Sequence, residues 1–305
     1  MNRTGIKPLK LFLAQAFGLC VFLMVSGERI YADSAESSWQ KADWIPIFQG
    51  IDAATGKADS PRLMRVYVIR IDTQAEGIEF YSTPRAEEGF VANVTETIRQ
   101  TVPQFLETHN LQAAINANFY VPFNAGTTRT AGPSNLRGLA VSRGQIVSPN
   151  EKNCPVFLVF KDRRVEIVDV QNDSDPPGEV ETAVAGHRIL VHEGTVLSQS
   201  NEAVHPRTAV GISADGRYVY FVVIDGRQRE YSDGATLAET GQWLVQFGAG
   251  SGLNLDGGGS TTMVVHSQDE EKKAKILNVP VGQGNPNTVR YNGNSLGVRA
   301  LPLAP

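Results

Sequence analysis

The chain has 305 residues, of which 41% are hydrophobic and 20% charged, and its formal net charge is −4. It is long enough for one large or two small domains with an ordinary apolar core, and its 29 glycines favour a strand- and turn-rich fold. It has no block of basic residues, which argues against nucleic-acid binding, because that depends on neutralising the phosphate backbone.

The N-terminus carries an export pattern. Three basic residues precede an uncharged apolar run at 11–25, and residues 30–32 resemble a cleavage site. The run is about 15 residues long, whereas a membrane-spanning helix needs roughly 20. We therefore expect a signal peptide at 1–32, a secreted or periplasmic protein, and no stable membrane span after cleavage. An uncleaved membrane anchor is the alternative.

The next segments alternate between polar and strand-like patterns. Residues 33–62 are polar and predict an irregular N-terminal extension. Residues 63–71 are rich in β-branched and aromatic side chains, which predicts a strand with 78–81 as its hairpin partner.

A first helix is predicted from about 94 to 108. Asn93 can cap it, Glu96 stands in capping-box position, and Pro103 should kink it. A second helix is predicted between the capping box of Thr236 with Glu239 and a stop at Gly248. Further strands are predicted at 111–115, 138–142, 145–148, 156–161, 164–170, 208–213, 218–224 and 263–265.

The most informative motif is the turn at 253–263, where an apolar strand leads into Asp256. Three glycines and three hydroxyl residues follow: Gly257, Gly258, Gly259, Ser260, Thr261 and Thr262. Glycines allow a close backbone approach to a ligand, and successive N–H groups in such a turn can form an anion-binding nest. A flexible hairpin between two strands is the simpler alternative. The turn lacks the pattern of a nucleotide-binding P-loop.

Two other polar clusters stand at predicted strand ends, where a rigid sheet can present side chains to one cleft. They comprise Asn116 and Asn118 in the first, and His205, Arg207, Asp225 and Arg227 in the second. Arginines suit bidentate recognition of phosphate, and a pair of aspartates suits acid–base or nucleophilic work on a glycosidic bond.

Each of these residues also has a structural interpretation. Asp225 can belong to an ordinary turn, His205 can be a surface or core histidine, and Asn116 can cap a turn. The histidines lack the spacing of metal ligands, so the sequence does not indicate whether a metal is bound. Ca²⁺ or Mg²⁺ held by Asp and Asn oxygens stays open.

Taken together, three segments resemble the phosphodiester glycosidase family. They are His205-Pro206-Arg207-Thr208, Val222 to Arg227, and Leu253 to Thr261. The segment Asn116 to Tyr120 is similar to that family's N-G-x-F-F element, and the resemblance covers about 112–299. Two departures stand out: Ala117 replaces a glycine, and Asn278-Val279-Pro280 lacks the arginine of an N-R-P element. Arg290 with Asn294 still resembles the closing segment.

The resemblance implies an α+β fold with mixed, strand-rich sheets and a few packed helices in a single catalytic domain at 63–301. It implies hydrolysis of a sugar-1-phosphodiester to free sugar and a phosphomonoester. In a bacterium the expected substrate is a phosphodiester-linked glycan of the envelope or exterior.

We expect Asp256 to be the nucleophile or base, with Asp225 as second choice. The expected substrate-binding residues are Asn116, Asn118, Arg207, Arg227, Gly257, Gly258, Gly259, Ser260 and Thr261, with His205 and Arg290 as further candidates. Two alternatives stay open: a metal-assisted phosphodiesterase that cleaves P–O, and a non-catalytic glycan-binding module.

Overall fold

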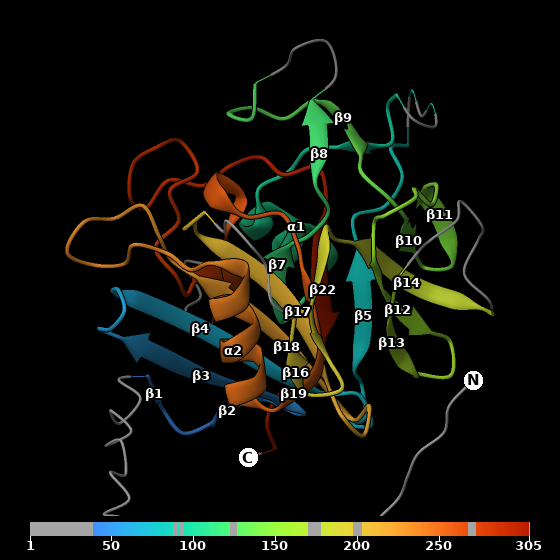
Figure 1. Ribbon diagram of the computed structural model, residues 1–305. Coiled ribbons are helices and arrows are strands. Elements are labelled where there is room, and N and C mark those ends of the chain that lie inside the picture. The colour runs from blue at the N-terminus through green and yellow to red at the C-terminus, as the bar shows by residue number, and fades with distance from the viewer. Residues whose placement is uncertain are drawn as a thin grey trace, which may run out of the picture. The chain divides into compact units, whose positions relative to one another are not determined.

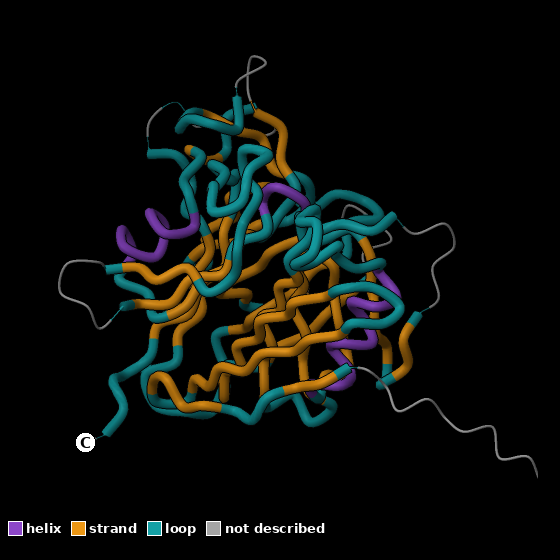
Figure 2. Tube along the Cα trace, turned by 90° about the vertical axis from the view of Figure 1, so that its left-hand side faces the viewer, coloured by secondary structure: helices purple, strands orange, loops and turns teal. Residues whose placement is uncertain are grey.

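Strands are the main secondary structure of the fold (Figures 1 and 2). The computed structural model describes residues 39–87, 89, 91, 94–122, 127–169, 178–197, 203–267 and 273–304. These residues belong to one compact unit, Ser37–Pro305. Within them, every pairing between two named strands is antiparallel.

The largest sheet in the described part of the chain has nine strands. In spatial order they are β1 (Gln40–Lys41), β3 (Ile51–Ala58), β4 (Met64–Asp72), β18 (Tyr218–Ile224), β17 (Arg207–Ser213), β19 (Ala249–Asn254), β15 (Arg188–His192) and β16 (Thr195–Val196), with β2 (Ile45–Phe48) paired to β3. The hairpin between β17 and β18 turns at Asp215-Gly216, as predicted from the tight-turn dipeptide.

Three smaller sheets complete the described part. One five-stranded sheet has the order β11 (Gln145–Ser148), β10 (Ala140–Ser142), β14 (Val180–Ala185), β12 (Val156–Phe160), β13 (Val165–Val168). The other has the order β21 (Ala274–Ile276), β20 (Met263–His266), β7 (Ala113–Asn116), β22 (Ser295–Arg299), β5 (Glu79–Ser82). A three-stranded sheet has the order β6 (Thr97–Ile98), β9 (Pro133–Leu136), β8 (Tyr120–Pro122).

The central core lies between the nine-stranded sheet and the two five-stranded sheets. Phe221 and Leu253 from the first sheet, Ile115 and Leu296 from β7 and β22, and Phe157 from β12 belong to one buried cluster. This arrangement brings the ends of β7, β17 and β19 together, because their apolar faces share that cluster.

Two α-helices occur in the described residues. Helix α2 (Leu237–Phe247) packs on the nine-stranded sheet through Trp243, Leu244 and Phe247 (Figure 1). Its predicted capping box of Thr236 with Glu239 and its stop at Gly248 are confirmed.

Helix α1 (Val102–His109) is shorter than predicted. Its N-cap is Thr101, which forms a capping box with Gln104, and Pro103 lies in the first turn, where its missing N–H costs nothing. The helix predicted over 94–101 is wrong, since 97–98 form β6 and the Glu96 carboxylate accepts from the Leu136 N–H. The predicted cap Asn93 lies outside the described residues.

The predicted fold class holds only in part. The fold is mostly β, and the sheets are antiparallel instead of mixed. Strand β5 pairs with β22 and not with β4, so the predicted hairpin of 63–71 with 78–81 is wrong. Residues 40–58 form β1, β2 and β3 of the largest sheet, in contrast to the irregular extension expected at 33–62.

The predicted signal peptide at 1–32 lies outside the described residues. None of the helices in the part of the chain that the structure describes is long and apolar enough to span a membrane.

Candidate active site

The glycine turn connects two different sheets. Strand β19 belongs to the nine-stranded sheet and β20 to a five-stranded sheet, so the turn is not a hairpin. Between them, Gly258–Ser260 form one turn of 3₁₀ helix. The alternative of a plain hairpin loop is therefore excluded.

Each glycine of the turn has a close neighbour that an added Cβ would meet. A Cβ on Gly257 would lie 2.8 Å from the Pro206 carbonyl oxygen. Gly258 has a φ of +63°, and its Cβ would lie 3.1 Å from the Arg227 Nη2. A Cβ on Gly259 would overlap the Arg290 guanidinium. Two arginines thus reach the backbone of this turn from elsewhere in the sequence.

Asp256 is fixed at both its backbone and its side chain. Its N–H donates to the Ala117 carbonyl at 2.9 Å, and its carbonyl accepts from the Asn116 Nδ2 at 2.5 Å. The carboxylate accepts from the Gly257 N–H at 2.9 Å and from the Ser260 hydroxyl. Asp256 as a whole residue keeps part of its surface exposed, so a ligand can approach it.

Burial raises the pKa of Asp256 to about 6, although the Ser260 hydroxyl, the Arg290 charge and the Gly257 N–H all act to lower it. A carboxylate with this pKa is mostly ionised at neutral pH and still basic enough to accept a proton. Its environment therefore suits a general base or a nucleophile.

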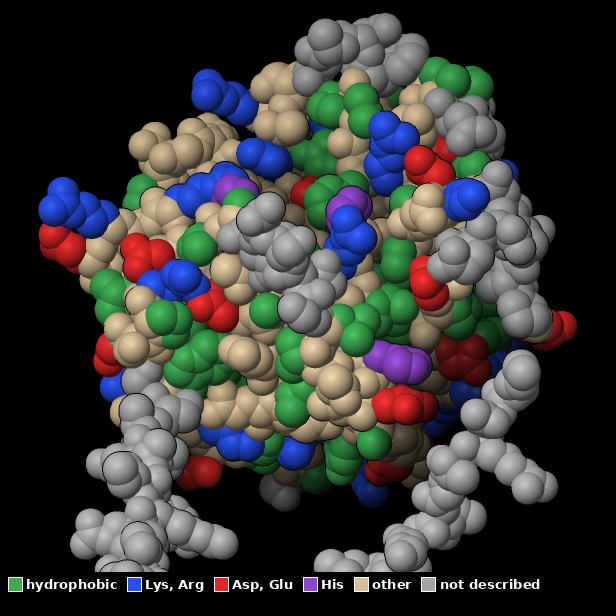
Figure 3. All heavy atoms as spheres, viewed as in Figure 1, with side chains coloured by type: hydrophobic (Ala, Val, Ile, Leu, Met, Phe, Trp, Pro, Cys, Tyr) green, Lys and Arg blue, Asp and Glu red, His purple; other side chains and the backbone are tan. Residues whose placement is uncertain are grey.

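Basic side chains surround the turn. Arg227, which adopts a φ of +60°, has its Nη2 3.3 Å from the Nδ1 of His205. Arg290 Nη1 donates to the Ser260 Oγ at 3.5 Å, and the buried Arg290 Nε has no protein partner. The space-filling view shows basic side chains and histidines gathered in the upper part of one face (Figure 3).

Tyr120 completes the same group. Burial and the nearby Asp256 charge raise its pKa to about 12, so its hydroxyl stays protonated. The hydroxyl donates to the Tyr291 carbonyl at 2.7 Å and lies within hydrogen-bonding reach of Ser260. Tyr120 was absent from the predicted site residues, although it ends the polar segment that begins at Asn116.

The predicted residues Asn116 and Asn118 are almost fully buried and bind the protein itself. The Asn116 Oδ1 accepts from the Thr208 hydroxyl at 2.8 Å and the Thr262 N–H at 3.1 Å, so this side chain joins β7, β17 and the glycine turn. Asn118 donates to the Arg137 carbonyl at 3.0 Å and accepts from the Ala185 N–H at 3.1 Å.

Asp225, the second-choice catalytic residue, has only 1% of its surface exposed. It accepts from the Asn278 Nδ2 at 2.8 Å, the Val279 N–H at 2.9 Å and the Tyr231 hydroxyl at 3.2 Å. Burial raises its pKa to about 6. The Asn278 Oδ1 in turn accepts from the Met263 N–H at 2.8 Å. Asp225 therefore anchors the segment that follows the glycine turn, and sequence gave no indication of Tyr231 in this role.

Two further predicted residues, Arg207 and Thr261, differ in their hydrogen bonding. The Arg207 Nε donates to the Ala235 carbonyl at 2.9 Å, and its Nη2 donates to the Ala203 carbonyl. Thr261 is buried, and its hydroxyl has no protein partner. Among the described residues, no group of three or more His, Cys, Asp or Glu side chains could hold a metal ion.

With this geometry established, comparisons with known proteins decide the family. The family model described as phosphodiester glycosidase matches residues 109–299. The chain belongs to the phosphodiester glycosidase family. The matched range includes Asp256, Arg227 and Arg290 as well as the anchoring residues around them. The family consists of hydrolases.

Solved structures share the fold at low identity. The catalytic domain of zebrafish N-acetylglucosamine-1-phosphodiester α-N-acetylglucosaminidase, auto-inhibited by its pro-peptide, is 18% identical with a TM-score of 0.59, over 87% of this chain and 84% of that one. A putative exported protein from Burkholderia pseudomallei is 16% identical with a TM-score of 0.59, over 82% and 76%. A hypothetical protein from Synechocystis is 14% identical with a TM-score of 0.54, over 85% and 64%. No curated protein matches the sequence.

Proposed function

We propose that this phosphodiester glycosidase hydrolyses the bond between the anomeric carbon of a sugar and the oxygen of a phosphodiester. The observation that carries the proposal is the partly exposed residue Asp256, with the Arg227 and Arg290 guanidiniums against the adjacent glycines. A carboxylate beside two guanidiniums provides one group for the chemistry and two for an anionic phosphate.

The proposed reaction consumes one water. Its oxygen ends on the anomeric carbon, the C–O bond to phosphate breaks with its electron pair staying on oxygen, and a phosphomonoester leaves. Phosphate is already a good leaving group, so strong general-acid help is unnecessary. The arginines stabilise the charge that develops on it, which is the step where preorganised cations contribute most.

Asp256 acts in one of two ways that stereochemistry separates. As a general base it would activate water and invert the anomeric configuration, whereas as a nucleophile it would form a glycosyl-enzyme and retain it. Asp225 is assigned an anchoring role, because its oxygens already accept three hydrogen bonds and it is almost fully buried.

Hydrolysis of a synthetic sugar-1-phosphate methyl ester in ¹⁸O-water tests the proposal. Label in the sugar supports the glycosidase, and the anomeric signal of the first product in a proton NMR spectrum gives the stereochemistry. Label in the phosphate would instead support a phosphodiesterase that cleaves P–O. Retention of a glycan without any product would support a binding module.

We further propose that the protein is exported and acts on a phosphodiester-linked glycan of the envelope or exterior. The basic and apolar pattern of residues 1–32 supports export. N-terminal sequencing of the mature protein should find Asp33 as the first residue. A mature chain that begins at Met1 would contradict the cleavage.

A further inference from the structure

A cavity of about 520 Å³ lies beside the edge strand β5. Its walls come from β5, from the turns of the β10–β11 and β12–β13 hairpins, and from β14 and β22. No residue of the glycine turn lines it. It is therefore separate from the candidate active site.

Cations predominate in the lining. Four basic residues, Arg143, Lys161, Arg163 and Arg299, face two acidic ones, Glu79 and Glu181. Arg299 pairs with Glu79 at 2.8 Å and Lys161 with Glu179 at 3.1 Å. In the part of the chain that the structure describes, Arg143 and Arg163 form no ion pair, which leaves two guanidiniums for an anionic ligand.

Arg143 is held in place by its turn and by an aromatic ring. It shares a tight turn with Gly144, and the two residues have φ angles of +51° and +74°. The Gly144 N–H donates to the Glu181 carbonyl at 2.9 Å. The Arg143 guanidinium lies 4.7 Å from the centroid of the Tyr81 ring, which is itself nearly buried. Stacking on a fixed ring leaves the edge of the guanidinium free for bidentate contacts.

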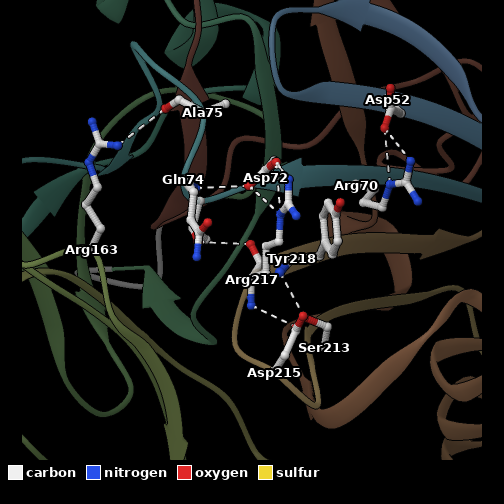
Figure 4. A network of polar contacts seen from close by, with 11 residues as sticks. Asp52, Arg70, Asp72, Gln74, Ala75, Arg163, Ser213, Asp215, Arg217 and Tyr218 are labelled. Atoms are coloured by element: carbon white, nitrogen blue, oxygen red, sulfur yellow. Dashed lines mark hydrogen bonds and ion pairs between the residues drawn. The ribbon is translucent and has the colours of Figure 1, made fainter.

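Arg163 comes from the second hairpin turn. Its φ is +69°, and its N–H donates to the Phe160 carbonyl at 2.9 Å. Figure 4 shows its side chain next to Ala75, apart from the ion pair of Asp72 with Arg217. It donates to the Ala75 carbonyl at 3.4 Å, a long contact that a stronger acceptor could replace.

The pKa of His109 agrees with an excess of positive charge around the cavity. Burial first, then the Arg143 and Arg299 guanidiniums, lower the pKa of His109. This histidine stays neutral at physiological pH and adds no charge of its own.

The cavity and the candidate active site lie at opposite ends of β7. Leu111, just before β7, lines the cavity, and Asn116 at the end of β7 binds the backbone of Asp256. The four residues of β7 alone span roughly 13 Å. A ligand long enough to occupy both places would have to be a chain of several sugar units.

We propose that this cavity is a second binding site for an anionic glycan. The acidic groups of the glycan bind Arg143 and Arg163, while a more distant sugar unit of the same glycan reaches Asp256. The inference rests on the proposed function, since it identifies the substrate as a polymer. Phosphate or carboxylate groups would satisfy the same two guanidiniums, and the choice of probe separates them.

The test uses the full chain with Arg143→Glu and Arg163→Glu combined. Binding is measured on an Asp256→Asn background, which prevents turnover, with phosphomannan, polygalacturonate and uncharged dextran as probes. We expect affinity for one anionic polymer to fall about tenfold or more, because two charge-assisted contacts are reversed in sign. Dextran should bind no variant, and added NaCl should weaken the binding that remains.

Lys57→Glu is the matched control for Arg143→Glu and Arg163→Glu measured singly, because it makes the same charge change as each of them at an exposed residue of β3 in another sheet. In the active enzyme, the double variant should raise KM for the polymer and leave kcat/KM for a small sugar-1-phosphate methyl ester unchanged. Equal polymer binding by the double variant and the control would overturn the second site. Failure to hydrolyse the small ester would count against the proposed function alone.

Discussion

Asp256 and Asp225 have similarly raised pKa values but very different surroundings. Asp256 is partly exposed, and its carboxylate accepts from Gly257 and Ser260 beside the Arg290 charge. Asp225 is buried and accepts from three donors of its own protein. Only the first can meet a substrate without breaking the fold, so a raised pKa by itself does not identify the reacting group.

Asp256→Asn should abolish turnover and leave the protein folded. We expect kcat to fall by about three orders of magnitude or more, because the substitution removes the carboxylate that the proposed mechanism uses and keeps the shape of the side chain. Asp215→Asn, on an exposed turn, is the control and should keep full activity. The small-ester assay measures both, and near-normal activity of the Asp256 variant would refute its assignment.

The same substitution should change stability with a definite sign. The folded pKa of Asp256 lies above its ordinary value, so the ionised group disfavours folding, and its contribution to stability decreases as pH rises from about 4 through 6. At pH 7 the free energy of unfolding of Asp256→Asn, measured in urea, should therefore exceed that of wild type by about 1 to 3 kcal/mol. The two proteins should converge near pH 4, and a larger difference at pH 4 than at pH 7 would show that the sign is wrong.

Activity should also depend on this titration. In the proposed mechanism deprotonated Asp256 is the reactive form, so kcat/KM for the small ester should rise with pH and level off above about 6. The phosphodiester does not titrate in this range. A profile that is flat between pH 5 and 7 would show that the ionisation of Asp256 does not control the reaction.

At the scale of elements, local patterns predicted many strands, and the structure has strands that overlap those predicted at 111–115, 156–161, 208–213 and 218–224. They could not predict partners: β5 pairs with β22, more than two hundred residues later in the chain, for which sequence carries no local signal. Local patterns were also insufficient to assign roles to polar residues at strand ends. Asn116 and Asn118 end a strand as ligand-binding residues do, yet both bind the backbone of neighbouring segments.

The glycine turn allows stability and function to be separated. Gly259→Ala places a Cβ against the Arg290 guanidinium, which is the flexible end of a side chain and can move away. We expect loss of activity with little change in melting temperature. Gly257→Ala places a Cβ against the fixed Pro206 carbonyl and should cost about 1 to 3 kcal/mol of stability. Equal effects of the two substitutions on melting temperature would contradict this division.

At the scale of the whole molecule, three sheets share one core, and the site forms where strands from two of them end. The glycine turn leaves the nine-stranded sheet and enters a five-stranded sheet, while Asn116 of that second sheet binds the backbone of Asp256. The position of Asp256 therefore depends on the packing between sheets. Sequence could indicate the residue and its family, but this arrangement requires contacts that are remote in the chain.

Trp39, which directly precedes β1, packs against helix α2. Trp39 stacks on Trp243 of α2 with ring centroids 4.6 Å apart and donates to the Ser60 carbonyl at 3.1 Å. Trp39→Ala should cost about 1 to 3 kcal/mol through lost burial and stacking, and lower the melting temperature by several degrees. Trp39→Phe keeps a ring and should lose less.

Ile45→Ala is the control for that experiment, because this side chain is 64% exposed and its loss should change stability by less than about 0.5 kcal/mol. Activity toward the small ester at 25 °C should be the same in all three variants, since α2 contributes no residue to the glycine turn. If Trp39→Ala has the same melting temperature as wild type, residues 39–48 contribute little to stability. They would then behave as the N-terminal extension expected from sequence. A clear loss would show that the largest sheet depends on them.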